Sequence, residues 1–393
     1  METLETYKPQ PFTIAVPQAD LDDLRQRLGR TRLPLQPADT AWQYGANGAY
    51  LARFLEYWRD GFDWRQWEAR LNDYENYRVS LPRPDDGTAQ TVHYLVARSS
   101  NPAARPLLLT HGWPGSVFEF IHILDRLTQP ERFGGRAEDA FTVICPSLPG
   151  YGFSIPLKQP ISPRQVAALW HDLITKALGI PRFFVQAGDW GSIVSSWLGA
   201  DFPAAVAAMH LNMVPLRPPL TTPLNDTEKA WAAEVKKRQS TESGYFAIQS
   251  TKPNTLGFGL TDSPAGLAAW IVEKFHGHPR GAANSEPPFT MDDMLATIAL
   301  YWLTDTAATA TWLYWAAVQR GDLSLKPGQY IAPPTAFLLP PWDLVPPSPP
   351  GWLERGYNVV QHRVMPCGGH FVAMEQPDIF VEDVQAFFRS QTL

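Results

Sequence analysis

The sequence Phe-Phe-Val-Gln-Ala-Gly-Asp-Trp-Gly-Ser, residues 183–192, joins an apolar run to a cluster of small residues around one aspartate. The run Phe183–Ala187 predicts a buried strand, and a helical stretch follows it. Ala187 and Gly191 lie two residues before and two after Asp189, where small side chains permit a sharp strand-to-helix turn. Such a turn holds its central side chain, here Asp189, above the strand ends.

An aspartate in that position is a candidate nucleophile. Its carboxylate is already ionised at neutral pH, so it needs no base before it attacks and forms an ester by displacement at carbon. The alternative is a structural aspartate that caps the following helix.

Two further segments supply partners for such a nucleophile. His370 follows two glycines on a late loop, and the chain order, nucleophile first and histidine last, favours a catalytic role. No carboxylate follows the expected strand Val206–Leu211, whereas Asp343 follows the expected strand Thr335–Leu339. We therefore expect Asp343 to orient His370, with Glu354 as a weaker rival.

The loop His-Gly-Trp-Pro-Gly-Ser at 111–116 follows another apolar strand, Leu107–Thr110. In a turn of this kind the backbone N–H groups of Trp113 and Trp190 form an oxyanion hole, and each such donor lowers a barrier by about 3 kcal/mol. We interpret His111 as a brace for the loop rather than a catalytic group.

The wider pattern predicts an α/β fold with a mostly parallel central sheet flanked by helices, an inserted helical cap and an N-terminal helical lead-in. We divide the chain into a lead-in (1–85), the first part of the core (86–216), the cap (217–330) and the second part of the core (331–393). No convincing strand precedes Gln90, and we expect Trp42, Trp58, Trp64 and Trp67 to fix the lead-in to the core. The helices expected in the cap span 226–239, 264–276, 291–303 and 306–320.

Composition excludes several classes of protein. The chain has 393 residues with 45% hydrophobic and 12% aromatic residues, which is enough to bury a core despite 38 prolines. A net charge of −6 disfavours a nucleic-acid partner. We see no signal peptide, anchor or apolar run of about 20 residues, and we expect a soluble, cytoplasmic protein without a membrane anchor. Cys145 and Cys367 lie in no metal or redox spacing, so we expect two buried, reduced thiols.

We also expect no cofactor and no metal. No Gly-rich phosphate loop follows a strand in the required way. His276 and His278 resemble a pair of metal ligands, but no Cys, Asp or Glu set of known spacing accompanies them.

Taken together, these motifs closely resemble those of the microsomal-type epoxide hydrolases, a group of the α/β-hydrolase superfamily that includes the juvenile hormone epoxide hydrolases. The resemblance rests on residues 111–116, 188–192 and 368–371, on the lead-in segment Phe62-Asp63-Trp64, and on the cap segments 242–245, 261–270 and 301–304. It implies conversion of a small apolar epoxide and water to a vicinal diol through an aspartyl ester, without a cofactor. A homodimer formed through the cap is plausible on the same resemblance.

The family's two cap tyrosines correspond to Tyr245, in Glu-Ser-Gly-Tyr, and to Tyr314, thirteen residues after Tyr301. Tyr301 is a rival for the second position, because that region diverges. Many relatives carry Glu where this chain has the shorter Asp343, so His370 is expected to sit slightly differently.

Other functions compatible with the motifs differ in class. A haloalkane dehalogenase also uses an Asp nucleophile, a late His and often a Trp after the nucleophile, but the cap tyrosines and the lead-in favour the epoxide. A non-catalytic binding protein of this fold usually lacks a triad member, and none is missing here. An ester hydrolase is disfavoured, because Asp attack on a carbonyl would form an anhydride.

Overall fold

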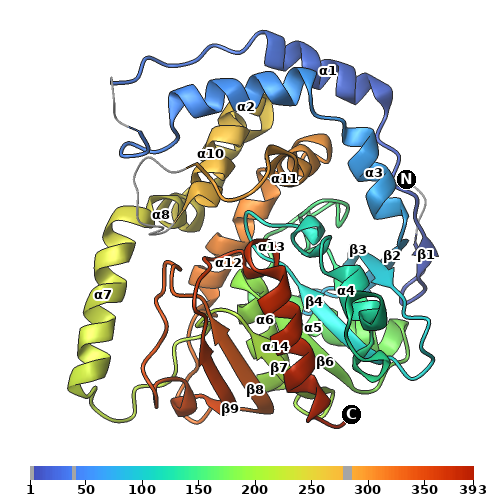
Figure 1. Ribbon diagram of the computed structural model, residues 1–393, viewed down its shortest axis with the longest axis vertical. Coiled ribbons are helices and arrows are strands. Elements are labelled where there is room, and N and C mark those ends of the chain that lie inside the picture. The colour runs from blue at the N-terminus through green and yellow to red at the C-terminus, as the bar shows by residue number, and fades with distance from the viewer. Residues whose placement is uncertain (1–3, 38–40, 278–285) are drawn as a thin grey trace.

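One twisted sheet organises the molecule. The computed structural model describes residues 4–37, 41–277 and 286–393, and within them nine strands pair in the order β1-β2-β3-β5-β4-β6-β7-β8-β9 (Figure 1). The pairs from β5 across to β9 are parallel, and those among β1, β2, β3 and β5 are antiparallel. The strands are β1 Gln10–Pro11, β2 Glu75–Pro82, β3 Ala89–Ala97, β4 Arg105–Thr110, β5 Phe141–Pro146, β6 Phe183–Ala187, β7 Val206–Leu211, β8 Ile331–Leu339 and β9 Tyr357–Val364.

The register of the parallel strands brings their carboxyl ends to one edge. Thr110 of β4 pairs with Ala187 of β6, and Ala187 pairs with Leu211 of β7. Leu339 of β8 pairs with Val364 of β9. The loops that leave these ends therefore meet, as expected for a ligand site in an open parallel sheet.

Helices cover both faces of the sheet. On β7, Met209 packs against Gly199 of α6 (Asp189–Asp201), and its neighbour His210 lies 3.0 Å from Asp383 of α14 (Pro377–Arg389). Successive strand residues point to opposite faces, so α6 and α14 lie on opposite sides. The other core helices are α4 Leu124–Thr128, α5 Pro163–Asp172, continued by a π-helical turn at Leu173–Ala177, and α13 Val372–Glu375.

A helical block lies between β7 and β8 in the chain. It contains α7 Asp226–Glu242, α8 Gly244–Thr251, α9 Pro253–Asp262, α10 Pro264–His276, α11 Met291–Leu303 and α12 Trp312–Arg320. The four cap helices expected from the sequence are present, although α12 starts at Trp312, after a short 3-10 turn at Thr309–Thr311. The helices α8 and α9 were not expected.

The lead-in contains strands as well as the helices that the sequence predicts. It contains helices α1 Gln18–Gly29, α2 Gly48–Asp60 and α3 Trp64–Asn72, but β1 and β2 also belong to it, so the prediction of no strand before Gln90 was wrong. The strand β2 carries buried polar residues that hide its apolar alternation. One of them, Asn76, is satisfied because its Oδ1 atom lies 3.0 Å from His93 Nε2 on β3.

The lead-in is also attached to the cap and not only to the core. Trp64 and Trp67 pack edge-on against Phe118 of the core, as expected. Trp42, however, stacks on His276 of α10 with ring centroids 3.9 Å apart, which corrects the expectation that it contacts the core. In Figure 1 the helices α1 and α2 accordingly cross the top of the molecule above α10 and α11.

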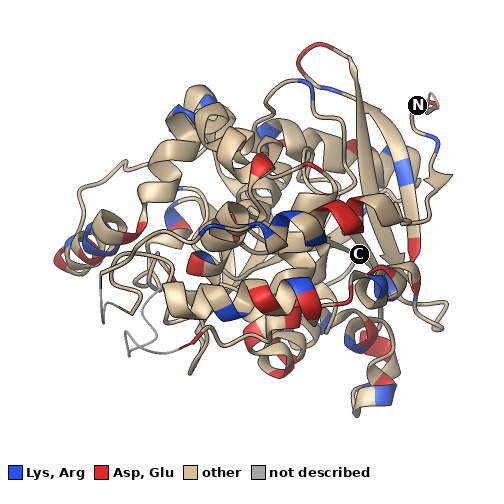
Figure 2. Ribbon diagram, turned by 90° about the horizontal axis from the view of Figure 1, so that it is seen from above, with Lys and Arg blue, Asp and Glu red and all other residues tan. Residues whose placement is uncertain are grey.

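Charged residues are dispersed over the molecule. Lys and Arg alternate with Asp and Glu along the same helices (Figure 2). In the part of the chain that the structure describes, no helix is both long enough and apolar enough to cross a bilayer. Both cysteines are free; Cys145 is buried, whereas Cys367 is only half-buried, contrary to expectation.

Candidate active site

The turn between β6 and α6 presents Asp189 at the carboxyl edge of the sheet. Asp189 adopts a φ of 44°, a left-handed conformation that costs energy for a residue with a side chain. A Cβ atom on Gly191 would lie 2.1 Å from the carbonyl oxygen of Thr110 on β4. Only glycine therefore lets α6 start this close to the neighbouring strand, which explains the small residue two positions after Asp189.

His370 lies between two carboxylates. Its Nε2 atom is 3.3 Å from Asp189 Oδ2, and its Nδ1 atom is 3.0 Å from Asp343 Oδ1. Asp343 is 2% exposed and also accepts a hydrogen bond from the backbone N–H of Leu344. Glu354, the rival acid, lies exposed in the 3-10 turn Leu353–Arg355. The three residues expected to form a triad are thus in contact.

The carboxylates control the charge of His370. Burial on its own lowers the pKa of this imidazole, but the charge of Asp343 and the hydrogen bonds to Asp189 and Asp343 outweigh burial. The pKa of His370 is consequently raised well above its ordinary value. In this state the imidazole holds its proton; when one of the two carboxylates loses its charge, the pKa of His370 falls, and the neutral ring can accept a proton as a base.

The other oxygen of Asp189 lies in the expected oxyanion site. The backbone N–H of Trp113 donates a hydrogen bond of 2.7 Å to Asp189 Oδ1. A Cβ atom on Gly112 would lie 2.0 Å from the same oxygen, so this loop approaches the carboxylate only because residue 112 is glycine. The N–H of Trp190 belongs to the first turn of α6, where backbone donors have no acceptor within the helix.

His111 braces this loop. Its Nε2 atom accepts a hydrogen bond of 3.2 Å from the N–H of Leu148, and its Nδ1 atom lies 2.9 Å from the carbonyl oxygen of Gly112. Because Nε2 accepts, Nδ1 carries the proton and donates it. Burial lowers the pKa of His111 to about 4, so the ring stays neutral. This geometry agrees with the expected structural role.

Two cap tyrosines line the same cavity as Asp189. Tyr245 on α8 stacks on Trp113 with centroids 5.3 Å apart, and Tyr314 on α12 packs edge-on against Trp190 at 4.5 Å. The rings of Tyr245 and Tyr314 lie 6.0 Å apart. Tyr301, the rival, instead donates a hydrogen bond of 2.7 Å to the carbonyl oxygen of Gly115, so its hydroxyl is already engaged outside the cavity.

Both cavity tyrosines remain protonated. Burial, and the negative charge of Asp189 with it, raise the pKa of Tyr245 and of Tyr314. Neutral phenols in a buried site donate hydrogen bonds and do not carry charge at neutral pH.

The cavity that contains Asp189, called the catalytic cavity because the predicted catalytic residues line it, is small and largely apolar. It encloses about 500 Å³, within the range of small-molecule sites. Apolar residues dominate its wall; they include Ile193, Val214, Val235, Phe246, Leu344 and Trp352.

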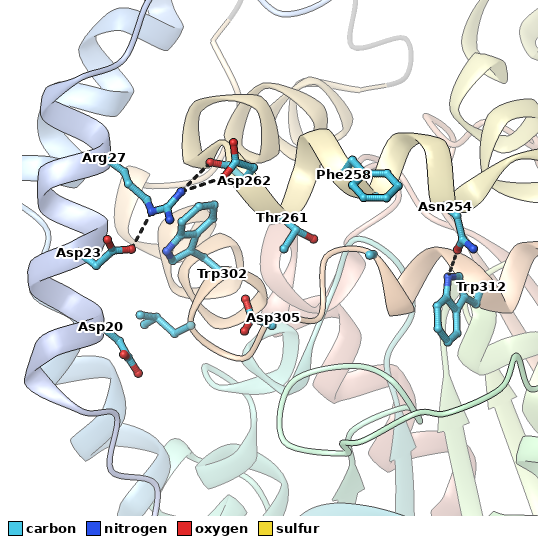
Figure 3. Close-up of a pocket in the computed structure, with 13 residues that line it drawn as sticks. Asp20, Asp23, Arg27, Asn254, Phe258, Thr261, Asp262, Trp302, Asp305 and Trp312 are labelled. Atoms are coloured by element: carbon cyan, nitrogen blue, oxygen red, sulfur yellow. Dashed lines mark hydrogen bonds and ion pairs between the residues drawn. The ribbon is translucent and has the colours of Figure 1, made fainter.

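A larger hollow lies elsewhere, in a groove of about 940 Å³ between α1, α9 and the ends of α11 and α12 (Figure 3). Its polar groups include Asp20, Asp23, Arg27 and Asp262. Arg27 forms ion pairs with Asp23 and Asp262. None of the residues predicted to be catalytic lines this groove. The larger hollow thus lies away from the residues predicted to be catalytic, which converge on the smaller cavity.

Sequence reasoning missed two acidic residues beside the site. The Glu375 carboxylate accepts hydrogen bonds from the N–H groups of Gly369 and Phe371, at 2.6 and 3.2 Å, on either side of His370. Glu119 lies buried under the loop that carries Trp113; burial raises its pKa to about 8, even though the charge of His370 acts in the opposite direction. An acidic residue shortly after a Gly-Gly-His loop is a sequence signal that would have identified Glu375.

No metal centre can be described. His278, one of the two histidines considered as a metal pair, lies outside the described residues. Within the ranges that are described, no group of three or more His, Cys, Asp or Glu side chains is arranged to hold a metal ion.

Comparison with known proteins identifies the family. Residues 9–120 match the family model for the epoxide hydrolase N terminus, and residues 105–255 match the alpha/beta hydrolase fold. A putative epoxide hydrolase of Stigmatella aurantiaca is 42% identical over 96% of this chain and 84% of that protein. Epoxide hydrolase 1 of Sus scrofa is 33% identical over 96% of this chain and 88% of that protein.

Solved structures agree over the full architecture. The epoxide hydrolase of Aspergillus niger matches with a TM-score of 0.81 and 32% identity, covering 97% of this chain and 96% of that one. The juvenile hormone epoxide hydrolase of the silkworm Bombyx mori matches with a TM-score of 0.84 and 29% identity, covering 98% and 96%. Together with the α/β sheet and its cap, these matches establish that the chain belongs to the epoxide hydrolase family and is a hydrolase that acts on epoxides.

Proposed function

We propose that this epoxide hydrolase works through a covalent ester on Asp189, with His370 and Asp343 activating water and Tyr245 and Tyr314 protonating the substrate oxygen. The observation that carries the proposal is the placement of the Asp189 carboxylate. One oxygen receives the Trp113 N–H at 2.7 Å and the other lies 3.3 Å from His370. The same cavity contains both tyrosines.

In the first half-reaction the epoxide enters between cap and core. The hydroxyls of Tyr245 and Tyr314 donate hydrogen bonds to the ring oxygen and stabilise the charge that develops there. Asp189 attacks one ring carbon from the opposite face. A carbon–oxygen bond to Asp189 forms, the ring carbon–oxygen bond breaks, and the ring oxygen takes a proton from a tyrosine.

In the second half-reaction His370 removes a proton from water, which attacks the ester carbonyl of Asp189. The N–H groups of Trp113 and Trp190 stabilise the oxyanion, and Asp343 stabilises the imidazolium. The ester bond breaks, the leaving oxygen takes the proton from the His370 imidazolium, and the diol leaves. The second proton of the water returns to the tyrosinate, and Asp189 retains an oxygen from water. The apolar wall of the cavity favours a small apolar epoxide as substrate.

Isotope and trapping experiments test this sequence of bonds. In a single turnover in ¹⁸O-labelled water, we expect the first diol to contain unlabelled oxygen, because that oxygen comes from Asp189. The variant His370→Gln should accumulate a mass adduct on the peptide that contains Asp189, whereas the exposed control His122→Gln should turn over normally. Labelled oxygen in the first product, or no adduct, would contradict the proposal.

The dehalogenase alternative has less support. Relatives that match nearly the whole chain are epoxide hydrolases, and the indole of Trp190, which would have to hold a halide, packs against Tyr314 at 4.5 Å. Incubation with a chlorinated alkane should release no halide, and halide release at the rate of epoxide turnover would reverse this assignment.

A further inference from the structure

A lysine lies beside one of the two cavity tyrosines. Lys274 on α10 places its Nζ atom 4.5 Å from the centroid of the Tyr245 ring. Its side chain is only 10% exposed, and the residue lines the catalytic cavity. The contact joins α10 to α8.

The second tyrosine has a different environment. The rings packed against Tyr314 are those of Trp113, Trp190, Tyr245 and Phe246. Among the described residues, no Lys or Arg lies over the Tyr314 ring as Lys274 lies over that of Tyr245. The two hydroxyls that serve the same substrate oxygen are therefore electrostatically unequal.

A cation over a phenol ring acts differently before and during reaction. The ring face is negative, so an ammonium group is attracted to it. This attraction strengthens as the hydroxyl proton moves toward the substrate, because the ring then takes on phenolate character. An interaction that is stronger in the transition state than in the ground state raises the rate of the chemical step.

The negative charges around Tyr245 oppose the loss of its hydroxyl proton, which a nearby cation would favour. The carboxylates of Asp189, Asp343 and Glu273 all act to raise the pKa of Tyr245, after the larger effect of burial. During attack, negative charge leaves Asp189 and appears on the oxygen held by the tyrosines. Lys274 lies beside Tyr245, close to where this negative charge appears. The charge of Lys274 is partly compensated by Glu273, whose Oε2 atom lies 2.5 Å from Lys274 Nζ.

We propose that Lys274 is a positioning residue for ring opening, which acts through the Tyr245 ring and makes Tyr245 the stronger of the two proton donors. This inference rests on the role given to Tyr245 under the proposed function. It assigns Lys274 no contact with substrate and no part in ester hydrolysis.

The test measures ring opening separately from hydrolysis. Trp113 and Trp190 adjoin Asp189, so their fluorescence should follow ester formation in a stopped-flow experiment with excess enzyme and styrene oxide as the probe. For Lys274→Met we expect the ester to form about 5- to 20-fold more slowly, while ester hydrolysis changes less than about twofold. Lys274→Arg keeps a cation over the ring and should restore most of the rate. The exposed cap lysine variant Lys252→Met is the matched control and should behave as the parent enzyme.

A double-mutant cycle decides whether the effect passes through the Tyr245 hydroxyl. In a Tyr245→Phe background, Lys274→Met should slow ester formation less than about twofold, whereas in a Tyr314→Phe background it should keep its full effect. Equal slowing in both backgrounds would overturn the inference. If Tyr245→Phe slows ester formation but Lys274→Met does not, only the inference on Lys274 fails. If Tyr245→Phe itself has no effect, the proposed role of Tyr245 fails.

Glu273→Gln covers the case in which Lys274→Met does not fold. This variant removes a negative charge from the neighbourhood of Tyr245 and leaves the lysine in place, so ester formation should be as fast as in the parent or up to about threefold faster. Slowing to the level expected for Lys274→Met would mean that the Lys274–Glu273 pair only maintains structure, and would also overturn the inference.

Discussion

The catalytic cavity has a floor made by the core and a roof made by the cap, and the two are built differently. Asp189, Asp343 and His370 in the floor are held by strand ends and by directional hydrogen bonds, with a strained φ of 44° at Asp189. Tyr245 and Tyr314 in the roof are held mainly by ring packing against each other and against tryptophans.

This difference matches the chemistry proposed for each part. An in-line attack requires the attacking oxygen to be positioned to within a fraction of an ångström and aligned with the bond that breaks. Fixed backbone geometry supplies that precision. Proton donors must follow an oxygen that moves as the ring opens, and packed aromatic rings allow small adjustments. We therefore expect substitutions in the floor to remove activity, and substitutions in the roof to reduce it and to change which substrates react.

The largest effect is expected from removal of the nucleophile. Asp189→Ala deletes the atom that forms the ester, so both ester formation and turnover should fall by at least about 10⁴-fold. Mass spectrometry after incubation with an epoxide should find no adduct. Turnover within tenfold of the parent would show that water attacks the epoxide directly and that the floor has no covalent role.

The next effect concerns the acid beside His370. Asp343→Asn removes the charge that contributes most to raising the pKa of His370. In the proposed mechanism hydrolysis of the ester requires neutral His370, so in the parent the rate of hydrolysis should rise with pH as the imidazole loses its proton. In the variant the pKa of His370 falls, so the rising limb moves to lower pH, while the maximal rate of hydrolysis falls by about 10³- to 10⁴-fold.

Ester formation provides the contrast for this variant. Because the proposed mechanism does not use His370 as a base in the first half-reaction, ester formation should change far less than hydrolysis, and the ester should accumulate. An unmoved pH profile would mean that another acid orients His370.

The roof is tested by Tyr245→Phe and Tyr314→Phe. Each variant loses one hydroxyl but keeps its ring packing, so ester formation should slow by about 10²-fold with little change in stability. Hydrolysis of the ester should stay within a few-fold. Slower hydrolysis with unchanged ester formation would reverse the division of labour between roof and floor. Tyr301→Phe serves as a control, because its hydroxyl is bonded to the loop at Gly115.

The same division decides how much of the candidate site could be predicted from the sequence. In the core, strands β6 and β7 were predicted to the residue, because continuous apolar runs mark them. The floor residues follow from strand ends, since a parallel register brings those ends together. No such rule applies to the roof, and Tyr245 and Tyr314 were found only through resemblance to a family.

The segments that were missed have physical reasons. Helix α9 contains Gly257 and Gly259, which weaken helix propensity, and it exists because it packs against its neighbours in the cap. Strand β2 was missed because its polar residues are buried in a hydrogen-bonded network that involves distant partners such as His93. The Lys274–Tyr245 contact was beyond reach for the same reason, since it joins two helices whose relative placement no local pattern defines.

The smallest effect that we predict comes from Glu375, which supports the floor without touching substrate. Glu375→Gln keeps one oxygen acceptor and places an NH₂ group where the second was, so only one of the N–H groups of Gly369 and Phe371 keeps its partner. The loop should then hold His370 less firmly, and ester hydrolysis should slow by about 3- to 10-fold while ester formation is unchanged.

Glu354→Gln is the matched control for Glu375→Gln. It also removes a carboxylate from the second part of the core, but that carboxylate is exposed. It should leave both half-reactions as they are. If Glu354→Gln slows hydrolysis and Glu375→Gln does not, the support of His370 comes from the rival acid. If both half-reactions slow equally in Glu375→Gln, Glu375 also affects the placement of Asp189. Its effect would then not be confined to the loop that carries His370.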